Sequence, residues 1–177
     1  MAVAQVVTGH QRPYRCIGPA DVLAAASRED GGCRIDSAGD LVEWLATLSP
    51  AERAEPHTFV VGVAGGLRLA PRRSEHVACS GGRPVLSAGE ITFAGQDTGW
   101  TVIEVSNQST GYCPEPSSWP FVAAACERAG LRHPGGFTTA FEFRRCSVCD
   151  LLAIVKDDDF TCAACGGELP TAWNASR

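Results

Sequence analysis

Two Cys-x-x-Cys pairs near the end of the chain constrain its fold more than any other feature. They are Cys146-Ser-Val-Cys149 and Cys162-Ala-Ala-Cys165, and twelve residues separate them. Zinc prefers four nitrogen or sulfur ligands in a tetrahedron, and each Cys-x-x-Cys turn offers two thiolates on one side of it. Disulfides and reduced thiols without a metal are the alternatives, but paired spacing in a chain expected in the cytoplasm favours the metal. The sequence therefore predicts a zinc ribbon over residues 144–170, with Cys146, Cys149, Cys162 and Cys165 as ligands.

The predicted zinc site is structural, because four cysteines leave no coordination position open for chemistry. The residues between the pairs are typical of a β-hairpin: apolar Leu151–Val155, a polar turn at Lys156–Asp159, then Phe160 and Thr161. Gly166 and Gly167 follow the second pair, where the backbone turns tightly and positive φ is expected. Residues 171–177 are expected to form a tail.

Composition and charge make several classes of protein improbable. With 45% hydrophobic and 20% charged residues, the 177-residue chain is typical of a globular protein. Its net charge is −5, and residues 144–170 contain three basic residues against five acidic ones. Four thiolates around one Zn²⁺ add a further −2 to this segment. Phosphate contacts require positive charge, so we do not expect nucleic acid as a partner.

The remaining cysteines and the N-terminal sequence indicate a reduced compartment. The apolar run from Met1 to Val7 is too short for a signal peptide, and no stretch approaches transmembrane length. We therefore expect a cytoplasmic protein without membrane contact. Five cysteines outside the ribbon show no paired spacing and are expected to be free thiols: Cys16, Cys33, Cys79, Cys113 and Cys126.

Hydrophobic periodicity and turn residues predict an α+β fold over residues 1–143. Helices are expected at 19–27, at 40–48 with Ser37 as N-cap, and at 119–129, with a helical N-terminal part over about 19–55. Strands are expected at 58–63, 67–70, 84–93, 100–105 and 137–143. Because short glycine-containing turns join successive strands, the β-rich part over about 57–143 should be a mainly antiparallel sheet flanked by helices.

Two loops between the predicted strands concentrate residues that bind ligands. The first, 72–83, contains His76, Ser80 and three arginines, Arg72, Arg73 and Arg83. The second, 106–114, contains Asn107, Ser109 and Tyr112. Guanidinium groups hold phosphate in bidentate fashion, so the arginines are candidates for an anion clamp, with a solvated surface as the alternative.

Part of this region resembles a known family. Glu75-His-Val-Ala-Cys-Ser-Gly-Gly-Arg-Pro-Val-Leu-Ser-Ala-Gly-Glu-Ile91 and Ser109-Thr-Gly-Tyr-Cys-Pro114 are similar to the central domain of the plant IQ-motif calmodulin-binding proteins. The family has a His-Ser-Ser-rich loop, an Ala-Ala-Gly strand and a Ser-Gly-His-Tyr-x-Pro loop. The resemblance covers about residues 59–116 and implies a shared β-rich domain and a shared pocket. The second histidine of the family pattern has no counterpart here, and without an IQ motif calmodulin binding does not carry over.

Three residues are candidates for catalysis. His76 suits a general base, an anion ligand or a structural hydrogen bond, since its pKa lies near neutrality. Glu90 suits charge stabilisation or a structural ion pair, and Tyr112 suits stacking on a base or packing at the sheet edge. The thiols of Cys79 and Cys113 become nucleophiles only if a base lowers their pKa. Phosphate-binding and nucleotide-binding glycine motifs, a Gly-x-Ser-x-Gly elbow and the zinc deaminase signature are all missing.

Two functions follow from these observations. The first is a cytoplasmic binding or adaptor protein that recognises a protein or a phosphate-bearing small molecule through loops 72–83 and 106–114. The second is a nucleotide-dependent transferase or hydrolase that uses His76, Glu90 and Tyr112 with the arginine clamp. The enzyme hypothesis requires His76, Glu90 and Tyr112 to lie in one pocket, whereas the binding hypothesis does not.

Overall fold

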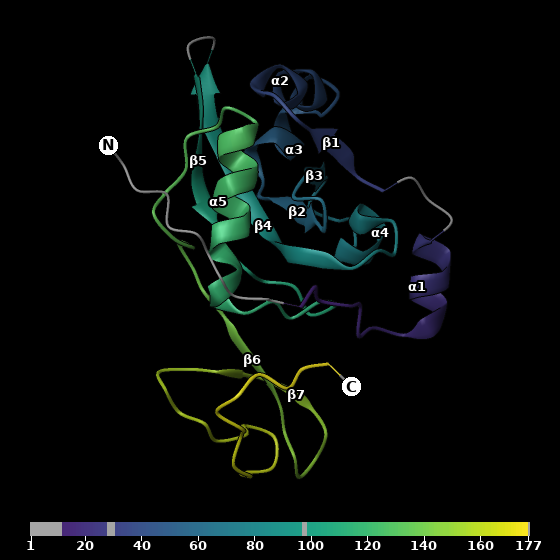
Figure 1. Cartoon of the computed structure of the whole chain (residues 1–177), viewed down its shortest axis with the longest axis vertical. Helices are drawn as coiled ribbons and strands as arrows, with labels where there is room; N and C mark the ends of the chain where they lie inside the picture. The colour runs from purple at the N-terminus through teal and green to yellow at the C-terminus, as the bar shows by residue number, and fades with distance from the viewer. Residues whose placement is uncertain (1–11, 28–30, 97–98, 177) are drawn as a thin grey trace.

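The computed structural model describes residues 12–27, 31–96 and 99–176. They form an α+β fold whose centre is a five-stranded antiparallel sheet in the order β1-β3-β2-β4-β5. The strands are β1 (Cys33–Ile35), β2 (His57–Gly62), β3 (Leu67–Ala70), β4 (Val85–Gln96) and β5 (Gly99–Val105). A second, two-stranded sheet of β6 (Glu142–Arg145) and β7 (Leu152–Val155) lies beyond one end of the first (Figure 1).

The helices cover both faces of the five-stranded sheet. Neighbouring side chains of a strand point to opposite faces, so Phe59 and Val61 of β2 join one buried cluster and Val60 joins the other. The first cluster packs against α2 (Ala38–Ala46) and α5 (Trp119–Arg128), and the second against α1 (Ala20–Ala26) and α4 (His76–Ser80). The fold class predicted from the sequence is therefore confirmed.

The helix ends follow from local side-chain chemistry. Ser37 caps α2, its hydroxyl accepting a hydrogen bond from the Asp40 amide while the Asp40 carboxylate accepts from the Ser37 amide. Ser49 and Glu52 form the same reciprocal pair at the start of α3 (Pro50–Ala54). The helix α4 ends at Gly81, whose φ of 62° is left-handed and favours glycine.

Several sequence predictions need correction. The predicted strand over 137–143 is wrong in position, because regular pairing begins only at Glu142 and residue 139 makes an isolated bridge to Ser106. The hairpin predicted between the two cysteine pairs is correct in its turn, because Lys156 and Asp159 form an antiparallel bridge in which the Asp159 amide donates to Lys156 O at 2.9 Å, but it is wrong in its strand pairing. Leu152–Val155 pairs with β6 rather than with Phe160 and Thr161, so the first cysteine pair itself forms the hairpin turn. The sequence analysis did not anticipate β1, and it treated α4 as a loop.

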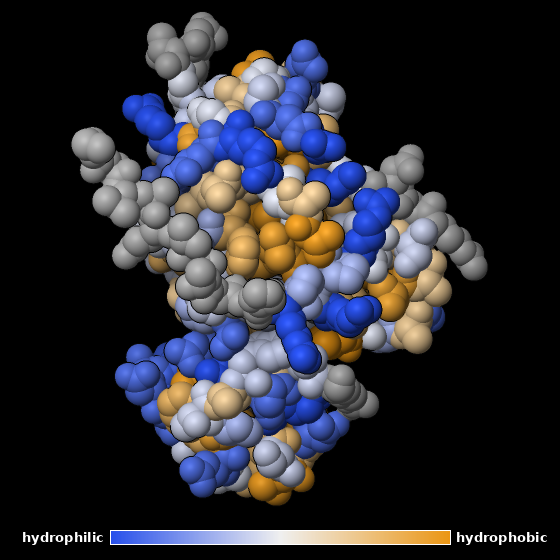
Figure 2. Space-filling model, viewed as in Figure 1, coloured by the Kyte–Doolittle hydropathy of each residue, from blue (hydrophilic) through white to orange (hydrophobic). Residues whose placement is uncertain are grey.

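The N-terminal segment before residue 12 and the tip of the β4–β5 connection at 97–98 lie outside the described residues. None of the described helices is long and apolar enough to cross a membrane. Hydrophobic residues reach the surface near the middle of the sheet domain in this view, and the two-stranded part below is mainly hydrophilic on the same side (Figure 2).

Candidate functional site

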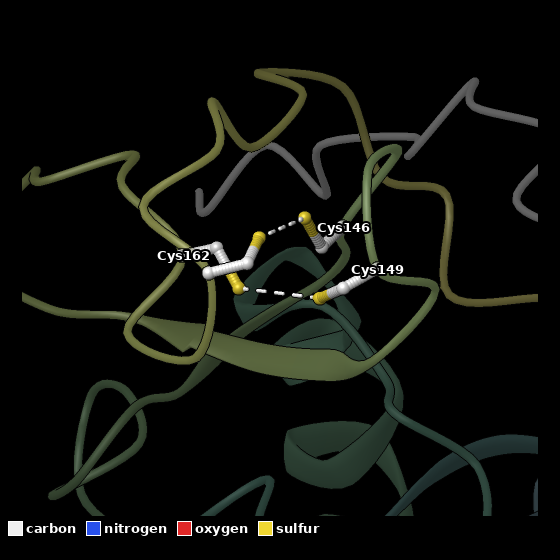
Figure 3. A group of neighbouring side chains, drawn as sticks. Cys146, Cys149 and Cys162 are labelled. Carbon is white, nitrogen blue, oxygen red and sulfur yellow. Dashed lines mark hydrogen bonds between the residues drawn. The ribbon is translucent and has the colours of Figure 1, made fainter.

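The four cysteines of the C-terminal region come together in one cluster (Figure 3). Their Sγ atoms all lie within 4.8 Å of one another. The distance is 3.6 Å between Cys146 and Cys165 and 3.7 Å between Cys149 and Cys162. A disulfide would bring two sulfurs to about 2.0 Å, whereas four sulfurs about 2.3 Å from one ion in a tetrahedron lie about 3.8 Å apart. The arrangement can therefore hold a metal ion.

Both cysteine pairs have the same backbone conformation. In the first, the Cys146 amide donates to Leu151 O at 2.9 Å and the Asp150 amide donates to Cys146 O at 3.0 Å. In the second, the Cys162 amide donates to Gly167 O and the Gly166 amide donates to Cys162 O, both at 2.8 Å. The fourth residue after each first cysteine has positive φ, 58° at Asp150 and 73° at Gly166. Two turns of equal geometry thus present their thiols to one point from opposite sides.

The surroundings of the cysteine cluster shift the pKa values of its thiols in opposite directions. The amides of Cys149 and Val148 point at Cys146 and lower its thiol pKa to about 6. At Cys165, the Gly167 amide lowers the pKa, but the neighbouring Cys149 and Cys146 raise it more, to about 12. Four thiolates this close repel one another, so their joint ionisation requires a positive ion between them.

The C-terminal tail fastens the ribbon to the sheet domain. The guanidinium of buried Arg144 donates to Pro170 O at 3.1 Å and to Thr171 O at 3.0 Å. The side chain of Asn174 bonds to both backbone groups of Arg145, at 2.8 Å each. The indole of Trp173 donates to Cys113 O at 2.8 Å. The fold of residues 170–175 is therefore tied both to β6 and to the loop 106–114.

His76 lies at the start of α4, in a cavity of about 310 Å³. Its Nε2 donates to Gly89 O at 3.0 Å, which leaves Nδ1 as an acceptor in the neutral ring. Burial lowers the pKa of this imidazole, so the neutral form dominates at pH 7. The cavity lies where α4 meets the second loop, and its walls are Cys16, Gly18, Pro19, Val22, Glu75, Val77, Thr110 and Gly111.

Tyr112 and Ser80 form a buried hydrogen-bonded pair away from solvent. None of the Tyr112 surface is exposed, and its hydroxyl lies 2.6 Å from the Ser80 hydroxyl and 2.8 Å from Arg83 O. Burial raises the pKa of Tyr112 to about 12. In this conformation the ring has no free face on which a ligand can stack, so it joins α4 to the loop 106–114 instead.

Asn107 and Ser109 are also buried. The Asn107 amide nitrogen donates to Pro114 O and to Phe141 O, and its oxygen accepts from the Phe141 amide, each at 2.7 Å. Both N–H donors of the side chain are thus used, and the three bonds connect the loop to the segment before β6. The Ser109 hydroxyl has no partner among the described residues. Of the second loop, Gln108 and Thr110 are exposed.

Glu90 and the three arginines do not join His76 in its cavity. Glu90 lines a separate cavity of about 330 Å³ with Glu104 and Thr138. Arg72 and Arg73 precede α4 and Arg83 follows it, and all three side chains are exposed. None of them lines either cavity or forms a salt bridge within the described part of the chain. Cys79 and Cys113 are buried, which raises the pKa of each thiol to about 12.

No protein-family model, curated protein or solved structure matches this chain. The resemblance of residues 59–116 to the IQ-motif proteins therefore stays a prediction. Sequence reasoning did not predict this cavity, since four of its nine lining residues come from the segment 16–22, and Thr110 and Gly111 had no assigned role.

Proposed function

We propose that this chain is a binding protein in which the four cysteines hold a structural zinc ion. Four thiolates in a tetrahedral arrangement are the donor set of structural zinc sites, and a closed set leaves no position for a substrate. The equal geometry of the two cysteine turns supports this assignment. Zinc would fix the turn between β6 and β7 and, through the tail, the loop 106–114.

The recognition site would be the cavity beside His76. The observation that carries this proposal is that loops 72–83 and 106–114, which are distant in sequence, line the same cavity of about 310 Å³. Its walls combine apolar Pro19, Val22 and Val77 with the acceptor Nδ1 of His76. A side chain of a protein partner that has an apolar body and a hydrogen-bond donor suits this lining. The exposed arginines around α4 suit a phosphate-bearing ligand instead, and the two partners are distinguishable by mutation.

A cytoplasmic location is part of the proposal. All nine cysteines are unpaired in the structure, including exposed Cys33 and Cys165. Free and metal-binding thiols persist in reducing compartments, whereas oxidising compartments favour disulfides.

The alternative of an enzyme has less support. It needs His76, Glu90 and Tyr112 around one substrate. Tyr112 is buried, and Glu90 and His76 line different cavities. We therefore retain the binding function as the proposal.

Affinity capture with matched variants tests the recognition site. Thr110→Trp fills the cavity from an exposed position, and Gln108→Trp places the same bulk on the same loop outside it. We expect quantitative proteomics to show partners that the wild type and Gln108→Trp retain and Thr110→Trp loses. Equal recovery by all three proteins would refute the site. A further variant changes Arg72, Arg73 and Arg83 to Gln. If this variant loses the partners and Thr110→Trp retains them, the phosphate-bearing ligand is favoured.

A further inference from the structure

A second cavity, of about 370 Å³, opens on the other face of the sheet domain. It lies between α2, the end of α3 and the far halves of β4 and β5. Most of its lining is apolar or aromatic, with Phe93, Ala94 and Trp100 on the strand side, and none of it overlaps the cavity beside His76. A mainly apolar cavity of this size with a few polar groups is typical of a small-molecule site.

His57 gives the cavity a polar group that the fold does not use. The side chain is only 1% exposed, and its Nδ1 is buried without a hydrogen-bond partner among the described residues. The ring packs against Trp44, with centroids 4.9 Å apart at 80°, and against Phe93, at 6.1 Å and 24°. Buried polar groups almost always have partners, so the Nδ1 of this cavity-lining histidine is a hydrogen-bonding atom that the described fold leaves unused.

Arg53 gives the same cavity a positive charge. Its Nε donates to Leu48 O at 3.0 Å, which fixes the guanidinium at the end of α3. No other charged residue lines the cavity in the described part of the chain, and the terminal nitrogens of Arg53 have no hydrogen-bond partner there. A guanidinium held in this way is suited to a carboxylate.

We propose that this cavity binds a small aromatic carboxylate. The ring of the ligand packs against Phe93 and Trp100, its carboxylate pairs with Arg53, and His57 hydrogen-bonds to it at the base of the cavity. The apolar walls exclude a strongly hydrophilic ligand such as a sugar phosphate, and the single cation selects an anion over a neutral or basic molecule. This site is separate from the proposed recognition of a protein partner, so either proposal can fail without the other.

Calorimetric titration with phenylacetate, with phenylacetamide as its neutral counterpart, tests the proposal. The account predicts saturable binding of phenylacetate and at least about tenfold weaker binding of the amide, because charge-assisted hydrogen bonds are the stronger ones. In NMR spectra, the indole N–H signal of Trp100 should shift during the titration. No saturable binding of phenylacetate, or equal affinity for the amide, would overturn the assignment.

Substitutions at two exposed positions of the cavity test where phenylacetate binds without changing the hydrophobic core. Arg53→Gln should weaken phenylacetate binding about tenfold, whereas Arg73→Gln, an exposed arginine outside the cavity, should leave it unchanged. Ala94→Trp places an indole in the cavity from the strand surface and should abolish binding. If phenylacetate binds Ala94→Trp or Arg53→Gln as tightly as the wild type, it binds elsewhere and the proposal is wrong.

Discussion

Asn107 connects three parts of the chain, and its replacement by alanine tests whether the loop 106–114 is held by internal bonds. The side chain makes three hydrogen bonds of 2.7 Å, two to Phe141 and one to Pro114. It is fully buried, so water cannot replace the lost bonds easily. Removal of one partner leaves the buried groups of the other unsatisfied, which costs more than the net value of the bond itself.

The expected loss follows from the number of bonds. At a minimum of about 1 kcal/mol for each of the three, Asn107→Ala should lower the free energy of unfolding by at least about 3 kcal/mol. For a chain of this size, this corresponds to a decrease in Tm of about 6–12 °C. Differential scanning calorimetry with excess zinc measures it, and Gln108→Ala, at an exposed neighbouring position, is the control. If Asn107→Ala keeps the wild-type Tm but loses partner binding, Asn107 contacts the ligand and the structural interpretation is refuted.

Three further predictions concern the ribbon, the sheet and pH. Cys162→Ser should lose the metal and make residues 144–170 sensitive to limited proteolysis, since metal binding in such modules contributes about 10 kcal/mol of folding free energy. A variant with full metal content and an unchanged proteolysis pattern would contradict this prediction. Gly89→Ala should destabilise the fold by about 3 kcal/mol in chemical denaturation, because the added Cβ would collide with Ser106 O; wild-type stability would show that the strands can separate. Burial lowers the pKa of His57 and His76 below 6.5. As pH falls, the unfolded chain therefore takes up protons at a higher pH than the folded chain, and the free energy of unfolding should decrease below about pH 6.5. Replacement of both histidines by Gln should make the free energy of unfolding depend less on pH. An unchanged pH dependence would show that these histidines do not cause it.

Local chemistry made most elements predictable. Ser37 before an apolar stripe was correctly predicted as the N-cap of α2, although the helix begins at Ala38 and not at residue 40. Pro120 and Gly130 marked the two ends of α5 within two residues. The strand β1 and the helix α4 were missed because both are short: three and five residues carry too little periodicity. The pairing of β7 with β6 was missed because the first cysteine turn also reverses the chain, in addition to the turn at 156–159 that the sequence indicated.

The candidate sites were predictable only where spacing alone determines geometry. The Cys-x-x-Cys pairs predicted the four-cysteine cluster because the two residues between the cysteines of a pair fix their separation within a turn. The ligand roles of Asn107 and Tyr112 were inferred from residue type in a loop, but the structure buries both side chains in internal hydrogen bonds. The two cavities combine segments distant in sequence, such as Arg53 with Trp100, and no local pattern indicates that packing.

Metal content combined with X-ray absorption on the full-length protein tests the central claim most directly. The account predicts one zinc ion for each chain, surrounded by four sulfurs at about 2.3 Å. Protein purified under reducing conditions that contains no stoichiometric zinc, or zinc with oxygen or nitrogen ligands in place of the four thiolates, would contradict it.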